Sequence, residues 1–324
     1  MSTTIILDCD PGIDDALAIA YAAGHPGIEL AGITTVAGNV GLAKTTANAL
    51  AVASFIGSPG VPVTAGCAAP LLRQSREAGH VHGESGLGGA VLPAPGRQAA
   101  DGHAVDFIVS AIAAAPGEIT LVATGPLTNI ALALRREPRL AQWVRDFVIM
   151  GGSAGRGNVT PAAEFNIWAD PEAAAIVFGA GWTVRMIGLD VTLRARATAE
   201  VQERMREFGR LGADLLLPAL SRYADSHNTA RGEPPVHDVC AVVSVVSPEV
   251  FGYTPAWVQV ETTGRLTSGM TVTDFSPAAT AAAGGGVHAA VGGEVNAVVA
   301  TDIDVDRFWD DVLHVYASLA RAMG

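Results

Sequence analysis

The stretch DCDPGIDD (8–15) places four aspartates within eight residues, directly after a short apolar run. Helix capping explains part of this cluster, because Asp14 and Asp15 at the start of a helix would interact favourably with the helix dipole. It leaves Asp8 and Asp10 unexplained, and clustered carboxylates repel one another unless they are protonated or hold a cation. Carboxylate oxygens prefer a hard ion such as Ca²⁺ or Mg²⁺, and the sequence has no Cys/His cluster with zinc spacing. The stretch therefore predicts a metal site.

Two later segments carry further polar residues that could contact a ligand. In AEFNIWADPEAA, Glu164 and Asn166 are spaced to lie on one side of an extended segment, ahead of a helix that begins at Asp170. Because they precede that helix, capping does not explain them, and we interpret them as ligand contacts. PPVHD places His237 and Asp238 just ahead of another helix. A helix cap or a metal ligand would explain Asp238, and a lone histidine is more often structural.

Three other motifs suggest different chemistry and are less well supported. A DxD after a strand also occurs in aspartyl phosphatases of the haloacid dehalogenase type, but PGIDD follows here and adds negative charge where a phosphate would approach. GNVGLAKT resembles a P-loop, but Ala43 replaces the glycine before the lysine. GGSAG fits the nucleophile elbow of a serine hydrolase, with Ser153 as nucleophile, although a loop and not a helix is predicted to follow it.

Composition limits the class of protein and its partners. The 324 residues are 49% hydrophobic and 16% charged, which is typical of a globular chain with a substantial core. A net charge of −12 argues against a nucleic-acid partner. No apolar run approaches the ~20 residues of a membrane span, and the N-terminus does not resemble a signal peptide. The three cysteines form no CxxC pair, so we expect a reducing, cytoplasmic setting and no membrane association.

Apolar β-rich runs alternate with helical patterns, which predicts a single α/β domain over 1–324 with a mostly parallel central sheet flanked by helices and a small antiparallel β excursion. In such sheets ligands bind beyond the carboxyl ends of the strands. The expected strands are 3–8, 29–36, 119–124, 146–150, 182–190 and 295–300, with the antiparallel excursion over 256–275. The expected helices are 14–23, 41–56, 103–115, 127–136, 170–179, 198–207, 211–227, one after His237, and 304–322. The residues expected at or just after strand ends are Asp8, Asp10, Asn39, Thr124, Met150 and Asp190.

Seven separated motifs resemble, in order, those of the inosine–uridine-type nucleoside hydrolases. They are DCDPGIDDALAI, TTVAGNV, HGESGLGG, ATGPLTNIA, IMGG, GNVTPAAEFNIWADPEAA and PPVHD. The match runs from residue 5 to about residue 250. It implies the nucleoside hydrolase fold and Ca²⁺-dependent hydrolysis of the N-glycosidic bond of ribonucleosides, in nucleoside salvage. It also implies a homo-oligomer, because members of the family are commonly dimers or tetramers.

The resemblance implies a role for each matched residue. Asp10 would be the general base that activates water, and Asp8 would support the site from behind. Ca²⁺ would be held by Asp10, Asp15, Asp238 and the backbone carbonyl of Thr124. The substrate contacts would be Asp14, Asn39, Glu164 and Asn166 to the ribose hydroxyls, Met150 and Asn158 along the sugar pocket, and His82, Phe165 and His237 facing the base.

The base-binding region leaves two questions open. No second carboxylate is placed as the leaving-group acid, and His237 is the natural candidate because an ordinary histidine titrates near neutrality. The stretch SRYADSHNTARGE does not match the family residue by residue, so Tyr223 and His227 are weak candidates and the preference for purine or pyrimidine is not predicted. The alternatives are a nucleoside- or pentose-binding protein without catalysis, which the full set of matched carboxylates argues against, and the serine hydrolase above.

Overall fold

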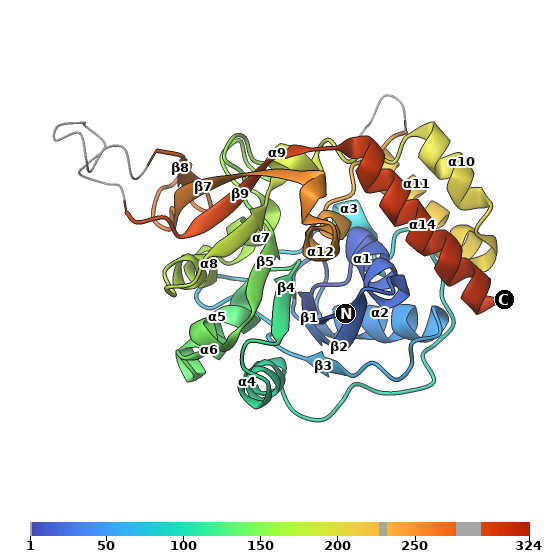
Figure 1. Ribbon diagram of the computed structural model, residues 1–324, viewed down its shortest axis with the longest axis horizontal. Helices are drawn as coiled ribbons and strands as arrows, with labels where there is room; N and C mark the ends of the chain where they lie inside the picture. The colour runs from blue at the N-terminus through green and yellow to red at the C-terminus, as the bar shows by residue number, and fades with distance from the viewer. Residues whose placement is uncertain (1, 227–231, 277–292) are drawn as a thin grey trace.

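The computed structural model describes residues 2–226, 232–276 and 293–324 (Figure 1). The strands are β1 (Thr3–Cys9), β2 (Ile28–Thr35), β3 (Val63–Ala65), β4 (Ile119–Ala123), β5 (Asp146–Met150), β6 (Val184–Ile187), β7 (Phe251–Val260), β8 (Thr271–Asp274) and β9 (Ala297–Ile303). The helices are α1 (Ile13–Gly24), α2 (Leu42–Phe55), α3 (Gly79–His82), α4 (Ala104–Ala114), α5 (Thr128–Arg136), α6 (Leu140–Trp143), α7 (Phe165–Ala169), α8 (Pro171–Phe178), α9 (Leu189–Thr192), α10 (Ala199–Arg206), the π-helix η1 (Leu211–Leu216), α11 (Leu217–Ser226), α12 (Asp238–Val246), the 3₁₀-helix η2 (Pro248–Val250) and α14 (Val305–Met323).

The strands form one sheet in the order β3-β2-β1-β4-β5-β6-β9-β7-β8. Strands β3 to β9 in that order are parallel, and β7 then pairs antiparallel with both β9 and β8. The predicted fold class, a mostly parallel α/β sheet with a small antiparallel part, is confirmed. The chain adds β2 and β3 on one side of β1 and returns to add β4 on the other. Such a switch in direction opens a crevice beyond the carboxyl ends of β1 and β4, where ligands bind in sheets of this kind.

Helices cover both faces of the sheet (Figure 1). Successive residues of β1 point to opposite faces: Ile5 and Leu7 pack into one core, while Ile6 packs into the other. Helices α1, α2, α12 and α14 bury their apolar sides in the first core, and α4, α5 and α8 in the second. Burial on both faces explains why the central strands are continuous apolar runs in the sequence.

The structure differs from the sequence prediction at several short elements. The strand expected over 182–190 ends at Ile187, and Asp190 lies in α9, so Asp190 is not at a strand end. The antiparallel part begins earlier than expected, at Phe251, because β7 pairs with β9 along most of its length. The stretch 211–227 starts as the π-helix η1. Strand β3 and helix α3, of three and four residues, are too short for a periodic signal in the sequence.

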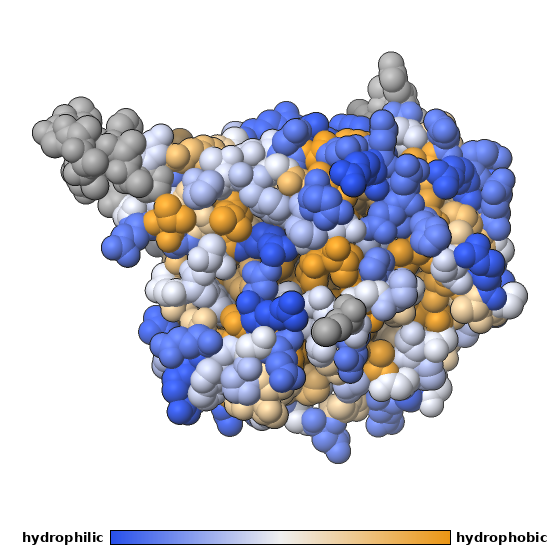
Figure 2. Space-filling model, in the orientation of Figure 1, coloured by the Kyte–Doolittle hydropathy of each residue, from blue (hydrophilic) through white to orange (hydrophobic). Residues whose placement is uncertain are grey.

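The surface carries no large apolar area on the face drawn in Figure 2, where hydrophilic residues predominate and hydrophobic ones form small separate patches. This mixture is normal for a folded protein. Within the part of the chain that the structure describes, no helix is both long enough and apolar enough to cross a membrane.

Candidate active site

The floor of the site is the turn between β1 and α1. Strand β1 ends at Cys9, and Gly12 is the N-cap of α1. Asp15 serves this helix start directly, because its Oδ2 accepts the Gly12 N–H at 3.0 Å and its Oδ1 accepts the Asp10 N–H at 3.3 Å. Its Oδ1 also accepts the Thr124 hydroxyl from the end of β4 at 3.0 Å. Capping therefore explains where Asp15 lies, but its carboxylate remains fully buried.

Asp10 is held differently, and it keeps an unused acceptor. Its Oδ2 accepts the Asn39 N–H at 2.7 Å, whereas its Oδ1 has no hydrogen-bond partner among the described residues. Two glycines make room for this carboxylate: a Cβ at Gly38 would lie 2.1 Å from Oδ2, and one at Gly125 would lie 2.7 Å from Oδ1. A buried, unpartnered carboxylate oxygen is costly, so it indicates a group that this site binds.

The floor concentrates uncompensated negative charge. Asp10, Asp14, Asp15 and Asp238 are all buried, and no arginine or lysine forms an ion pair with them in the described ranges. Burial raises the pKa of Asp14 to about 6 and that of Asp15 to about 7. Burial, reinforced by the neighbouring carboxylates, raises the pKa of Asp10 and Asp238 well above the ordinary range. A cation would remove this cost.

Three of these carboxylates are arranged so that they could hold a metal ion. Oxygens of Asp14, Asp15 and Asp238 lie within 4.8 Å of one another, and the donors are all oxygen atoms. The structure thus brings together Asp15 and Asp238 as predicted, with Thr124 beside them. It adds Asp14, which the sequence assigned to the ribose, and places Asp10 next to this group and outside it.

A cavity of about 890 Å³ opens above the floor. Thr124, His237 and Asp238 contribute to its wall, while Asp10 and Asp15 lie beneath it. The eight residues predicted to contact substrate all line the cavity: Asp14, Asn39, His82, Met150, Asn158, Glu164, Phe165 and Asn166. The structure therefore gathers these eight side chains, which span positions 14 to 166, in one place.

The side-chain N–H groups of Asn39 and Asn166 already donate hydrogen bonds within the protein. Asn39 Nδ2 donates to Asp10 O and Asp15 Oδ2, both at 3.1 Å. Asn166 Nδ2 donates to Thr124 O at 2.7 Å and to Met150 O at 3.0 Å. Each amide therefore retains its carbonyl oxygen as the group able to accept a hydrogen bond from a ligand hydroxyl.

One interpretation of the sequence was wrong. Glu164 and Asn166 do not share an extended segment, because Glu164 is the N-cap of α7 and Asn166 lies in its first turn. The Glu164 carboxylate accepts N–H groups of Asn166 and Ile167, and that of Gly152 across the site. Both side chains still line the cavity.

An aromatic cluster forms the other side of the cavity. His82 Nδ1 accepts the Ile13 N–H at 3.0 Å, which ties His82 to the start of α1. The Tyr223 ring lies 5.7 Å from that of His82 and 6.2 Å from that of His237. Its hydroxyl donates to Asp14 Oδ2 at 3.3 Å. His237 Nδ1 lies 2.8 Å from Thr192 Oγ1.

Several lining residues were not predicted from the sequence, and one was only a weak candidate. Tyr223, the weak candidate, is buried and contacts both histidines, whereas His227 lies outside the described residues. The lining residues that sequence reasoning missed include Glu77, His80, Arg156, Trp168 and Leu193. None of these lies at a strand end, although Glu77 and His80 stand close to His82 in the sequence and Trp168 lies within a matched motif.

Comparison with known proteins identifies the family. The family model described as inosine-uridine preferring nucleoside hydrolase matches residues 5–310. The chain belongs to this family. The inosine-uridine preferring nucleoside hydrolase of Crithidia fasciculata is 45% identical over 317 residues, which are 97% of each chain, and that of Leishmania major is 50% identical over 280 residues, 85% of this chain and 88% of the relative. The solved purine-preferring ribonucleoside hydrolase from Gardnerella vaginalis has a TM-score of 0.89 at 34% identity and covers 99% of this chain and 100% of its own.

Membership confirms the predicted enzyme class, hydrolases that act on N-glycosyl bonds. The serine hydrolase interpretation is not supported in this nucleoside hydrolase. Ser153 Oγ accepts the Gly155 N–H at 3.0 Å, and the segment after it continues as loop, so the GGSAG motif is not an elbow that opens into a helix. The nearby Asp190 accepts the Ala154 N–H at 2.9 Å and supports this loop.

Proposed function

We propose that this nucleoside hydrolase binds Ca²⁺ and hydrolyses the N-glycosidic bond of ribonucleosides to give free base and ribose. The observation that carries the proposal is the group of buried carboxylates without a basic partner at the floor of a cavity. An all-oxygen donor set fits a hard cation. The cavity volume of about 890 Å³ lies within the range of small-molecule sites.

The calcium ligands would be Asp10, Asp15, Asp238 and the backbone carbonyl of Thr124. The unpartnered Oδ1 of Asp10 and the proximity of Asp15 to Asp238 support this set. Asp14 is close enough to contribute, although we assign its carboxylate to a ribose hydroxyl. When bound, the ion supplies positive charge that acidifies a water molecule and attracts the vicinal hydroxyls of ribose.

Asp10 would also act as the general base and accept the proton of the attacking water. The carbonyl oxygens of Asn39 and Asn166 would accept hydrogen bonds from ribose hydroxyls, with Glu164 beside them. Cleavage builds positive charge on C1′ and the ring oxygen, and the surrounding carboxylates stabilise that charge. Met150 and Asn158 would line the sugar pocket.

His237 would deliver a proton to the departing base. It lines the cavity, and its contact with Thr192 fixes the orientation of the ring. His82 and Tyr223 would contact the base, because their rings cluster with that of His237 on one side of the cavity. Phe165, which also lines the cavity, would contact the base as well. These aromatic faces accept purines and pyrimidines alike, which fits relatives named both as purine-preferring and as pyrimidine-specific.

We further propose that residues 1–324 act as one domain, in a cytoplasmic enzyme of nucleoside salvage that assembles as a homodimer or homotetramer. Three free, buried cysteines are consistent with a reducing compartment. The assembly rests on the family resemblance alone. Sedimentation equilibrium of the purified chain tests it, and a monomer at micromolar concentration would contradict it.

The decisive experiment is a panel of nucleosides assayed for free ribose. We expect release from inosine and uridine by the calcium-loaded protein, and loss of at least ~10³-fold in kcat for Asp10→Asn. Asp106→Asn, at a carboxylate of α4 that is 48% exposed, serves as the matched control and should remain active. Tight nucleoside binding without ribose release would instead favour the alternative, a binding protein that lacks catalysis.

A further inference from the structure

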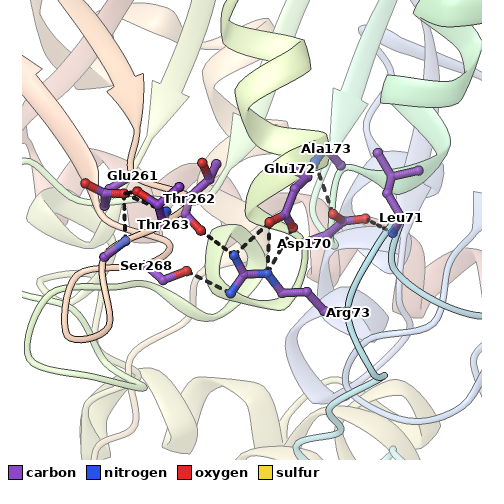
Figure 3. Close-up of polar contacts among 10 residues, drawn as sticks. Leu71, Arg73, Asp170, Glu172, Ala173, Glu261, Thr262, Thr263 and Ser268 are labelled. Atoms are coloured by element: carbon purple, nitrogen blue, oxygen red, sulfur yellow. Dashed lines mark hydrogen bonds and ion pairs between the residues drawn. The ribbon is translucent and has the colours of Figure 1, made fainter.

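Arg73 joins three segments that are far apart in the sequence (Figure 3). Its guanidinium donates to both carboxylate oxygens of Glu172, at 2.7 Å from Nη2 and 2.9 Å from Nε. It also donates to Ser268 Oγ at 2.8 Å and to Thr262 O at 2.6 Å. The side chains of Arg73 and Glu172 are only 23% and 20% exposed. A half-buried, two-pronged pair of this kind is stronger and more directional than an exposed ion pair.

The partners of Arg73 are themselves firmly held. Glu172 lies in the first turn of α8, next to the N-cap Asp170, whose carboxylate accepts the Ala173 N–H at 3.0 Å. The same carboxylate accepts the Leu71 N–H at 2.9 Å, two residues before Arg73. In the loop between β7 and β8, Glu261 accepts two backbone N–H groups, so this loop has a defined shape (Figure 3). Arg73 therefore binds groups whose own positions are fixed by hydrogen bonds.

The segment that follows Arg73 forms part of the cavity wall. The Arg76 guanidinium stacks over the Trp168 ring at 4.2 Å from its centroid, and Trp168 itself lines the cavity. Further along the same segment, Glu77 and His82 also line the cavity. His82 goes on to accept the N–H of Ile13, beside the carboxylates of α1.

This wall has little secondary structure of its own. Between β3 and α4 the described chain forms only α3, a helix of four residues. A helix of one turn is unstable in isolation, so its position depends on tertiary contacts. The contacts of Leu71, Arg73 and Arg76 fix the segment just ahead of it.

We propose that Arg73 is a positioning residue for substrate binding, which holds residues 77–82 against the cavity by clamping the preceding segment to α8 and to the β7–β8 loop. Arg73 is not among the residues that line the cavity, so it acts through the wall and not on the substrate. The proposal rests on the proposed function, because His82 in this wall is assigned to the base of the nucleoside. Without the clamp, part of the binding free energy must order the wall, which weakens binding.

The test compares Arg73→Ala with Arg185→Ala. Arg185 pairs with Asp146 at similar exposure, 20% and 31%, but at the amino end of β5, away from the cavity. We expect Arg73→Ala to raise the KM for inosine about tenfold or more with a smaller change in kcat, and Arg185→Ala to leave KM within about twofold. Arg73→Lys keeps the charge without the two-pronged geometry and should lie between wild type and Arg73→Ala. A KM for Arg73→Ala equal to that of Arg185→Ala would overturn the proposal.

A second readout does not depend on catalysis. Arg76 and Glu77 are already exposed, and release of the clamp should make the backbone between them more mobile, so trypsin should cleave after Arg76 about tenfold faster in Arg73→Ala than in wild type or in Arg185→Ala. Equal cleavage rates in all three proteins would also overturn the proposal. If no protein in the set releases ribose, the proposed function fails, and the cleavage rates still decide whether Arg73 holds the wall.

Discussion

Glu164 allows the electrostatics of the site to be tested without any metal. Its side chain is 2% exposed, and its carboxylate accepts three backbone N–H groups, those of Gly152, Asn166 and Ile167. Burial nevertheless outweighs these hydrogen bonds and raises the pKa of Glu164 from 4.5 to about 7. Glu164→Gln keeps the shape of the side chain and removes the titration.

The sign and size of the effect follow from this pKa. A carboxyl group with a higher pKa in the folded state binds its proton more tightly there than in the unfolded state. Its contribution is therefore most favourable below pH 4.5, is lost as the pH rises to about 7, and is constant above that. The difference between 4.5 and about 7 corresponds to ~3 kcal/mol. For 324 residues this is about 5 °C in Tm.

The assay is thermal unfolding in chelator at several values between pH 4.5 and pH 8. We expect the Tm of Glu164→Gln minus that of wild type to rise by about 5 °C over this range, whatever its value at pH 4.5. Glu172→Gln is the matched control: hydrogen bonds from Arg73 lower the pKa of Glu172, so its contribution to stability changes mainly below pH 4.5 and its Tm difference should stay nearly constant from pH 4.5 to pH 8. A constant difference for Glu164→Gln across the range would refute the reasoning.

Three further predictions concern the metal, the sugar and the base. Elemental analysis should find one calcium per chain, and a chelator should abolish activity until calcium is restored; zinc as the bound metal would contradict the donor set. Uridine should exceed 2′-deoxyuridine in kcat/KM by ~10³–10⁴, because a site built for a vicinal diol is left with unsatisfied polar groups, and comparable values would exclude the ribose contacts. His237→Ala should lower kcat for inosine by ~10²-fold or more but largely spare 4-nitrophenyl riboside, whose leaving group needs no proton. Equal losses of kcat on the two substrates would instead indicate a structural role for His237.

Much of the floor of the site could be predicted because its residues lie in one short stretch or follow strand ends. Asp10 and Asp15 belong to one short stretch, and Thr124 ends the neighbouring strand, so the topology of a parallel sheet is enough to bring them together. Capping, which the sequence already suggested, does operate: Asp15 binds the Gly12 N–H. The negative charge that capping leaves unexplained pointed to this group of buried carboxylates, and capping does not neutralise it in the structure.

Other parts of the fold could not be predicted because their determinants are distant. Glu164 was expected in an extended segment, whereas the structure shows it as the N-cap of the one-turn helix α7, where its carboxylate accepts the N–H groups of Asn166 and Ile167. Asp190 was expected at a strand end, but β6 stops three residues earlier and α9 begins at Leu189. Short elements such as these carry too few residues for a periodic pattern.

The two parts of the site therefore differ in what holds them. The floor is built by β1, β4 and the start of α1, whose positions follow from a buried sheet, and its Asp15 carboxylate keeps its place through backbone N–H groups close in sequence. The wall over residues 77–82 has only the short helix α3 and contacts such as that of His82 with Ile13 as a frame, and the segment ahead of it is held by Arg73, whose partners lie 99 and 189 or more positions further along the chain. Substitutions in the floor should accordingly change catalysis, whereas substitutions around Arg73 should change binding. Under the proposed assignment the wall contacts the base and the floor contacts the sugar, so we expect variation around Arg73 to alter base preference without disturbing the chemistry at C1′.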